Sequence, residues 1–180
     1  MRKIQIGIIG PEEQNIPAEK RELFLSSAYT IGKRLAENDV IVFTGGCSGI
    51  AEYSSRGAFE AGGITVATPG PERGTSVKST TIEICTSINV GDFVFAGTLS
   101  SDVLIVFPGD AGTIAELAIA YRYRKPLVLI KSISEGILEN IFEKISDYPV
   151  FVAADAEEAV NKSLEIAREK LNNLEQNGDD

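Results

Sequence analysis

The chain has 180 residues, of which 43% are hydrophobic, and this predicts one domain with an ordinary packed core. Its formal net charge of −9 argues against a nucleic-acid partner, which needs a basic surface. The chain has no histidine, which excludes histidine-ligated metals and Ser-His or Cys-His nucleophile pairs, and we expect no metal site.

The start of the chain is interpreted as a strand. Residues 1–10 are basic and then apolar, as in a signal peptide, but they lack a small-residue cleavage site. Gly10 and Pro11 end the run, as turn residues end a strand. No apolar run reaches the roughly 18 residues of a membrane span, so we expect a cytoplasmic protein without a membrane partner.

Seven strand-like runs alternate with helical periods along the chain. Several are continuously apolar, as strands buried on both faces of a sheet must be. The predicted strands are 3–9, 40–44, 64–68, 82–85, 102–107, 126–130 and 149–152. This alternation predicts an α/β fold, a doubly wound and mostly parallel sheet with helices on both faces.

Three helices are indicated by apolar residues at helical spacing. Their predicted buried stripes are Phe24, Ala28, Ile31 and Leu35; Ile114, Leu117, Ala118 and Tyr121; and Val160, Leu164, Ala167, Leu171 and Leu174. No linker or repeat divides the chain. We therefore expect one domain over residues 1–174 and a disordered acidic tail over 175–180.

Glycine-rich turns follow four of the predicted strands, at Gly10 and within 44–52, 68–75 and 108–116. Ligands of open α/β sheets bind beyond the carboxyl ends of the strands. The turns therefore predict a binding site along that edge.

The turn at 45–49 opens a predicted helix. Its glycines allow close backbone approach, and the free N–H groups of a helix start can hold a phosphate. Alternatively, this is a tight turn in which Ser48 is the helix N-cap. Cys47 either has a lowered pKa at the helix start or is simply a small turn residue.

The turn at 108–116 has the same character and adds a carboxylate, Glu116. Thr113 and Glu116 fit a capping box, in which the threonine is the N-cap and the glutamate bonds back to its N–H. The other interpretation is a functional carboxylate at the ligand edge. Both roles are compatible, since a cap also fixes the glutamate rotamer.

The usual nucleotide fingerprints are missing. No G-x-G-x-x-G follows the first strand, the second strand ends in Thr44 rather than an acidic residue, and no P-loop motif occurs. This argues against an NAD-dependent dehydrogenase and against a P-loop ATPase or kinase.

The two turns together resemble the Lonely-Guy superfamily, whose members are also called lysine decarboxylase-like. "TGGCSGIAEYSSRGAFEAGG" is followed about sixty residues later by "PGDAGTIAE", and the superfamily signature is P-G-G-x-G-T-x-x-E. The resemblance covers roughly residues 3–131. The short chain and the segment "SRGAFEAGGITV" are most similar to the branch that contains molybdenum-cofactor carrier proteins.

The resemblance implies a Rossmann-like homodimer. Enzymatic members hydrolyse the N-glycosidic bond of nucleoside 5′-monophosphates, and Glu116 matches their catalytic glutamate. No cofactor is required, but a bound nucleotide or molybdopterin-type ligand is expected. The candidate ligand- or phosphate-binding residues are Gly10, Gly45, Gly46, Ser48, Gly49, Pro108, Gly109, Gly112 and Thr113.

Two departures from the superfamily pattern favour binding over turnover. Asp110 replaces the second glycine of the motif, which places a carboxylate near an anionic ligand. The hydrolases carry an Arg-Lys pair where this chain has Phe93 and Val94. The leading hypothesis is therefore binding of a phosphorylated nucleotide or pterin-nucleotide, and the alternative is a phosphoribohydrolase that uses Glu116.

Several cations and one helix end have alternative roles. Arg73 and Lys78 either hold a phosphate from their loop or are solvated, and Arg56 is expected on the surface. Residues 121–124 suit the dimer contact of the superfamily, or have simple core and surface roles.

Overall fold

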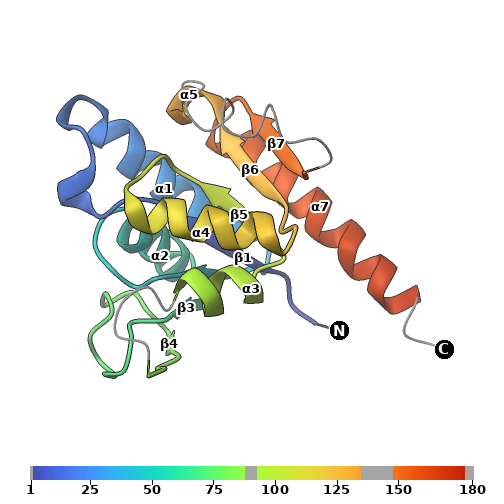
Figure 1. The fold of residues 1–180 in the computed structure, drawn as a ribbon, viewed down its shortest axis with the longest axis horizontal. Coiled ribbons are helices and arrows are strands. Elements are labelled where there is room, and N and C mark those ends of the chain that lie inside the picture. Colours follow the sequence, from blue (N-terminus) through green and yellow to red (C-terminus); the bar gives the residue numbers. More distant parts are fainter. Residues whose placement is uncertain (1, 88–92, 135–147, 177–180) are drawn as a thin grey trace.

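One parallel sheet of seven strands forms the centre of the computed structural model, which describes residues 2–87, 93–134 and 148–176 (Figure 1). The order is β4-β3-β2-β1-β5-β6-β7, and every neighbouring pair is parallel. The strands are β1 Gln5–Ile9, β2 Ile41–Thr44, β3 Thr65–Ala67, β4 Ile82–Glu83, β5 Val103–Val106, β6 Leu127–Ile130 and β7 Val150–Ala153. All seven predicted strands are confirmed, and so is the doubly wound, Rossmann-like fold.

Helices cover both faces of the sheet. The α-helices are α1 Arg21–Glu37, α2 Ile50–Glu60, α3 Thr98–Ser100, α4 Ala111–Arg122, α5 Lys131–Ser134 and α7 Ala156–Gln176, with a π-helical turn, η3, at Phe93–Gly97. Short 3-10 turns, η1 Glu13–Asn15 and η2 Ala18–Lys20, precede α1. Residues 177–180 of the predicted tail lie outside the described residues.

The side chains of β5 show why two cores form. Val103 and Ile105 join one buried cluster with α1, α2 and α7, whereas Leu104 and Val106 join another with η3 and α4. Side chains alternate between the faces of a strand, so an unbroken apolar run supplies both cores.

The predicted helix stripes are only partly correct. The four residues predicted for the first helix are buried in α1, and Val160, Leu164 and Ala167 are buried in α7. The stripe predicted for α4 is correct only at Leu117, because Ile114 is 64% exposed, Tyr121 is 48% exposed and Ala118 is also exposed. The buried residues of α4 are Thr113, Leu117 and Ala120. In α7, Leu174 of the predicted stripe is 51% exposed. Since α4 has apolar residues on every side, its spacing does not single out the buried face.

Two glycines let α1 and α2 approach closely. A Cβ on Gly32 would lie 2.7 Å from the carbonyl carbon of Ser54, and one on Gly57 would lie 3.0 Å from the backbone N of Lys33. These contacts fix α2, and with it the turn at 45–49, against the rest of the domain.

The strand order reverses beside β1, which lies between β2 and β5. In an open α/β sheet this is where the loops at the carboxyl ends diverge and leave a crevice. The turns after β1, β2 and β5 are therefore neighbours at the predicted ligand edge.

Candidate functional site

The three turns touch one another at the carboxyl edge of the sheet. The carbonyl of Pro11, after β1, accepts a hydrogen bond from the Ile50 N–H at 3.2 Å. Asn15 Nδ2 donates to Asp110 Oδ2 at 2.6 Å, which joins the first turn to the turn after β5. Segments far apart in the sequence therefore form one continuous site.

The candidate glycines fall into two groups. Gly10, Gly49 and Gly109 are closely packed. A Cβ on Gly10 would lie 2.7 Å from Ile50 Cγ1. A Cβ on Gly49 would lie 2.6 Å from the Pro11 carbonyl oxygen, and one on Gly109 would lie 3.2 Å from Pro11 Cδ. A Cβ on Gly112 would lie 3.3 Å from Asp110 Oδ1, which is also a tight contact, whereas one on Gly45 would have its nearest neighbour at 3.6 Å. The first group holds the turns together, and Gly45 leaves space for a side-chain atom beside the backbone.

A helix start can hold an anion at its free N–H groups, and the turn at 45–49 leads into the start of α2. The helix begins at Ile50 and its N-cap is Gly49, with a φ of 75° and no side-chain cap, so the interpretation of Ser48 as N-cap is wrong. Glycine is needed there because the turn bends against Pro11 with a positive φ. In the described part of the chain, the N–H groups of Ala51 and Glu52 have no acceptor.

Other amides of the turns already have partners. The Gly46 N–H donates to Thr44 Oγ1 at 3.2 Å, and the Gly112 N–H donates to Asp110 Oδ1 at 3.0 Å. Gly46 also accepts a hydrogen bond from the Val77 N–H, which links the β2 turn to the loop after β3. The Ala51 and Glu52 amides, which have no acceptor, thus lie at the start of α2, in the helix that follows the turn at 45–49.

Asp110, not Thr113, is the N-cap of α4, so the capping-box interpretation is wrong. The helix starts at Ala111, which places Thr113 inside the first turn. The Thr113 side chain is only 3% exposed, and its Oγ1 has no hydrogen-bond partner among the described residues. A Cβ on Gly109 would collide with this oxygen, so the hydroxyl lies directly over the glycine turn.

Glu116 lies one turn further along α4 and is half-buried. Burial, followed by the nearby Asp110 carboxylate, raises its pKa from 4.5 to about 8. No described arginine or lysine comes within ion-pair distance of it, and its oxygens have no described hydrogen-bond partner. Glu116 is therefore mostly protonated at neutral pH.

Cys47 marks the point where carboxylates of different turns meet. The residue is exposed to solvent, although protein atoms lie close enough to its thiol to raise the pKa. Burial, Glu12, Glu116 and Asp110 raise its pKa to about 11. The interpretation of Cys47 as a thiol with a lowered pKa is therefore wrong, because burial, together with the nearby negative charges, outweighs the effect of the helix start.

The place of the hydrolase Arg-Lys pair is apolar. Phe93 is 4% exposed, its ring centroid lies 6.0 Å from that of Phe43, and its Cβ is the neighbour nearest to the open side of Gly45. Arg73 lies 4.0 Å from Glu83 instead of reaching the site. The described site thus has carboxyl groups, free amides and a buried hydroxyl, but no cation beside Glu116.

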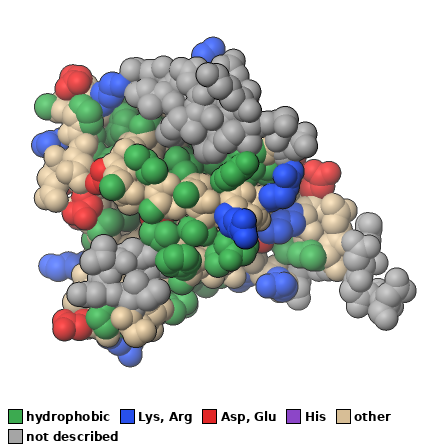
Figure 2. Space-filling view, viewed as in Figure 1, with side chains coloured by type: hydrophobic (Ala, Val, Ile, Leu, Met, Phe, Trp, Pro, Cys, Tyr) green, Lys and Arg blue, Asp and Glu red, His purple; other side chains and the backbone are tan. Residues whose placement is uncertain are grey.

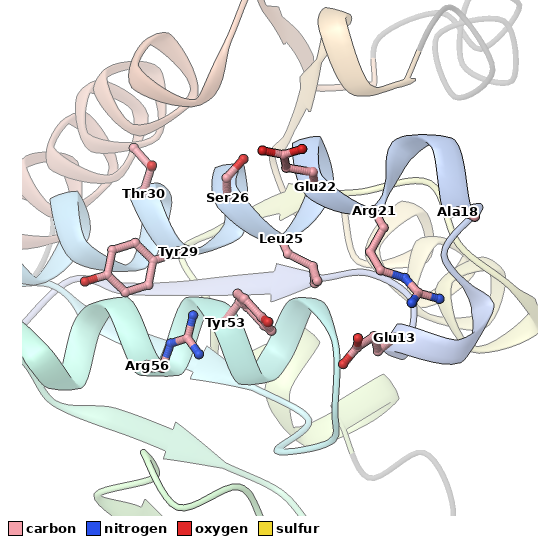
Figure 3. Close-up of a pocket in the computed structure, with 10 residues that line it drawn as sticks. All are labelled: Glu13, Ala18, Arg21, Glu22, Leu25, Ser26, Tyr29, Thr30, Tyr53 and Arg56. Atoms are coloured by element: carbon pink, nitrogen blue, oxygen red, sulfur yellow. The ribbon is translucent and has the colours of Figure 1, made fainter.

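A groove of about 720 Å³ lies between α1 and α2 (Figure 3). Arg56 lies within it, with its guanidinium carbon 4.2 Å from the ring centroid of Tyr53 and 5.5 Å from that of Tyr29. Arg56 is exposed, as expected, and its guanidinium also contacts two aromatic rings. Apart from Glu13 and Ala18, which lie in the 3-10 turns η1 and η2, the groove is lined by residues of α1 and α2 away from the glycine turns.

The described residues include no group of three or more cysteines and carboxylates that could hold a metal ion. None of their helices is long and apolar enough to cross a membrane.

The matched sequence model decides the family. The model described as "SLOG cluster4 family" matches residues 3–160, which is most of the chain. The chain belongs to the SLOG cluster4 family. A SLOG relative, an uncharacterised protein of Archaeoglobus fulgidus, is 33% identical over 145 residues, which are 79% of this chain and 90% of the relative.

Solved structures similar to this SLOG protein include molybdenum-cofactor proteins. The molybdenum cofactor binding protein of Rippkaea orientalis is 30% identical with a TM-score of 0.81, over 92% of this chain and 98% of that chain. The molybdenum cofactor carrier protein of Chlamydomonas reinhardtii is 33% identical with a TM-score of 0.79, over the same shares of 92% and 98%. These matches confirm the suspected superfamily and branch.

Proposed function

We propose that this protein binds the molybdenum cofactor, or a related phosphorylated pterin or nucleotide, at the carboxyl edge of the sheet. The observation that carries the proposal is the likeness, over nearly the whole chain, to proteins that bind or carry this cofactor. The contacts among the turns after β1, β2 and β5 support the carboxyl edge of the sheet as the place of this binding.

The chemistry of the edge fits a pterin that carries a phosphate. The phosphate would face the free amides of Ala51 and Glu52, beside the open side of Gly45. The carboxylates Glu12 and Asp110 accept hydrogen bonds, and a pterin offers donors from its amino group and ring N–H. In this arrangement the negative phosphate and the carboxylates contact different parts of the ligand.

Thr113 supports a ligand on this edge independently. A buried hydroxyl without a partner costs about 1–3 kcal/mol, and proteins rarely leave one unpaired. A ligand over Gly109 would give Oγ1 its missing partner.

The second candidate function is hydrolysis of a nucleoside 5′-monophosphate. It is favoured by the match of Glu116 to the superfamily motif and by its pKa of about 8, which keeps a proton available for a departing base. In this reaction water adds to the sugar carbon and the base leaves with a proton. The absence of a described cation beside Glu116 favours binding without this reaction.

Two experiments test and separate these functions. Isothermal titration with the molybdenum cofactor and with AMP measures binding. Gly45→Ala should weaken the binding of the ligand about tenfold, because the added methyl group occupies the open side of the turn. Gly62→Ala is the control, because its Cβ would meet nothing within 4 Å. Incubation with AMP, followed by chromatography for free adenine, should show equally little release by wild type and Glu116→Ala.

We also propose a homodimer through α4. Figure 2 shows hydrophobic side chains gathered over α4 and α3, and Ile114, Tyr121 and Phe95 are 64%, 48% and 48% exposed. A helix that is apolar on all sides is normally covered. Light scattering should give twice the chain mass for wild type and the chain mass for Ile114→Glu; a monomeric wild type would contradict the proposal.

A further inference from the structure

A second pocket lies at the opposite edge of the sheet, where the strands begin. It has a volume of about 350 Å³ and is formed mainly by the start of β1, α3 and the start of β5, the second residue before β6 and the last turns of α7. Phe43 of β2 and Ile84, which follows β4, also line it. Its charged lining residues are the cations Arg2, Lys3, Lys125 and Lys170 and one carboxylate, Asp102. A cationic pocket is unexpected in a chain with a net charge of −9.

Lys125 is held in place from two sides. Arg124 has a φ of 51°, so the chain turns sharply after α4 and directs Lys125 to the start of β6. Its Nζ donates to the Ser101 carbonyl at 2.9 Å and to the Leu99 carbonyl. Because an ammonium group has three N–H donors, one remains for a ligand.

The charges around Lys125 are not balanced. Lys170 Nζ lies 3.4 Å from Asp102 Oδ1, and the other oxygen of Asp102 accepts the Gln5 N–H at 3.0 Å. Burial, followed by repulsion from Lys170, lowers the pKa of Lys125. Lys3 pairs with Asp39, which does not line the pocket. Arg2 has no ion-pair partner in the described ranges, so Asp102 alone faces Lys125, Lys170 and Arg2. An added anion would relieve this repulsion.

Apolar residues complete the pocket. Its walls include Leu99, Ile84 and Leu174, which are 36%, 44% and 51% exposed. Figure 2 shows cationic side chains grouped at the end of α4 that leads to Lys125. The volume lies within the usual range of small-molecule sites, and the combination of cations and apolar walls suits an organic anion better than a bare ion.

We propose that this pocket is a second binding site, which takes a small organic oxyanion: a phosphate or carboxylate group joined to an apolar body. Lys125 and Lys170 hold the anionic group, with Arg2 at the rim. The leucine and isoleucine side chains cover the apolar part. The site does not depend on the function proposed for the other edge.

Nuclear magnetic resonance titration with phenyl phosphate tests the proposal, because backbone amides report the two edges separately. Saturable shifts are expected in residues 99–102 and 170–174, with tighter binding than for inorganic phosphate or phenol. Lys125→Gln and Lys170→Gln should each weaken binding about tenfold. Lys33→Gln, at a surface ion pair on α1, is the matched control and should bind like wild type.

Three results would overturn the proposal. The chemical-shift changes could be confined to the glycine turns, or the protein could bind phosphate and phenyl phosphate with equal affinity. The third is that Lys170→Gln binds phenyl phosphate as tightly as wild type does. Lys125 also donates to two carbonyls, so we expect Lys125→Gln to lose stability. Lys170→Gln and Arg2→Gln lack this structural role, and their affinities decide the question even when Lys125→Gln does not fold.

Discussion

Glu116→Gln should change how the stability of the fold depends on pH. The folded protein raises the pKa of Glu116 from 4.5 to about 8, whereas the unfolded chain titrates near 4.5. The folded state therefore binds one more proton between these values, and the free energy of unfolding falls as pH rises through this window. The stabilising contribution is fully present below pH 4.5 and lost above pH 8.

The magnitude follows from the size of the pKa change. A difference of about 3.5 pH units corresponds to about 5 kcal/mol at 1.36 kcal/mol per unit. This is an upper limit, because water entering the half-buried site lowers the cost of the charged form. Glutamine has the shape of the protonated side chain and carries no charge. Glu116→Gln should therefore match wild type near pH 4.5 and exceed its stability by several kcal/mol at pH 8.5.

Urea denaturation at pH 5, 7 and 8.5 measures this difference. Subtracting the wild-type curve cancels the titration of the other groups, and Glu169→Gln, at an exposed position of α7, is the control. If the stability difference between Glu116→Gln and wild type is the same at all three pH values, Glu116 does not lie in the environment described here.

Three other predictions concern the turns. Gly49→Ala should lower the free energy of unfolding by about 3 kcal/mol, because the new Cβ meets the Pro11 carbonyl at a residue with positive φ. Gly62 also has a positive φ but lies in open space, so Gly62→Ala should cost only about 1 kcal/mol. Equal losses of the two variants in urea denaturation would refute this prediction. Cys47 should react with iodoacetamide at pH 8 at least about tenfold more slowly than free cysteine, because its raised pKa leaves little reactive thiolate. Mass spectrometry of the peptide that contains Cys47 measures the rate. A rate equal to that of free cysteine would show that the pKa of Cys47 is not raised. Thr113→Val should raise the free energy of unfolding by about 1 kcal/mol, because it removes a buried hydroxyl that has no described partner. The same change should weaken binding of the molybdenum cofactor. A loss of stability would mean that the hydroxyl has a partner in the protein.

The sheet could be predicted from the sequence because strands buried on both faces are apolar throughout. The glycine turns could be placed on one edge for a related reason: parallel strands all end there. Both conclusions need only local pattern and the rules of α/β topology.

The helix starts could not be predicted as well, because distant residues decide them. Gly49 replaces Ser48 as N-cap since the turn packs against Pro11, and Asp110 is held by Asn15 as well as by its own helix. Spacing alone favoured Thr113, which is a good cap in isolation.

Charges are also hard to interpret from sequence. Arg2, Lys125 and Lys170 are each ordinary surface cations in their own segments, and only the fold brings them together. The raised pKa of Glu116 likewise depends on its burial and on Asp110, which no spacing rule supplies.

Calorimetric titration of wild type and Gly45→Ala with the molybdenum cofactor tests the central claim most directly. We expect saturable binding by wild type and about tenfold weaker binding by a Gly45→Ala protein of unchanged stability. No heat with wild type, or equal affinity of the two proteins, would contradict binding at the carboxyl edge of the sheet.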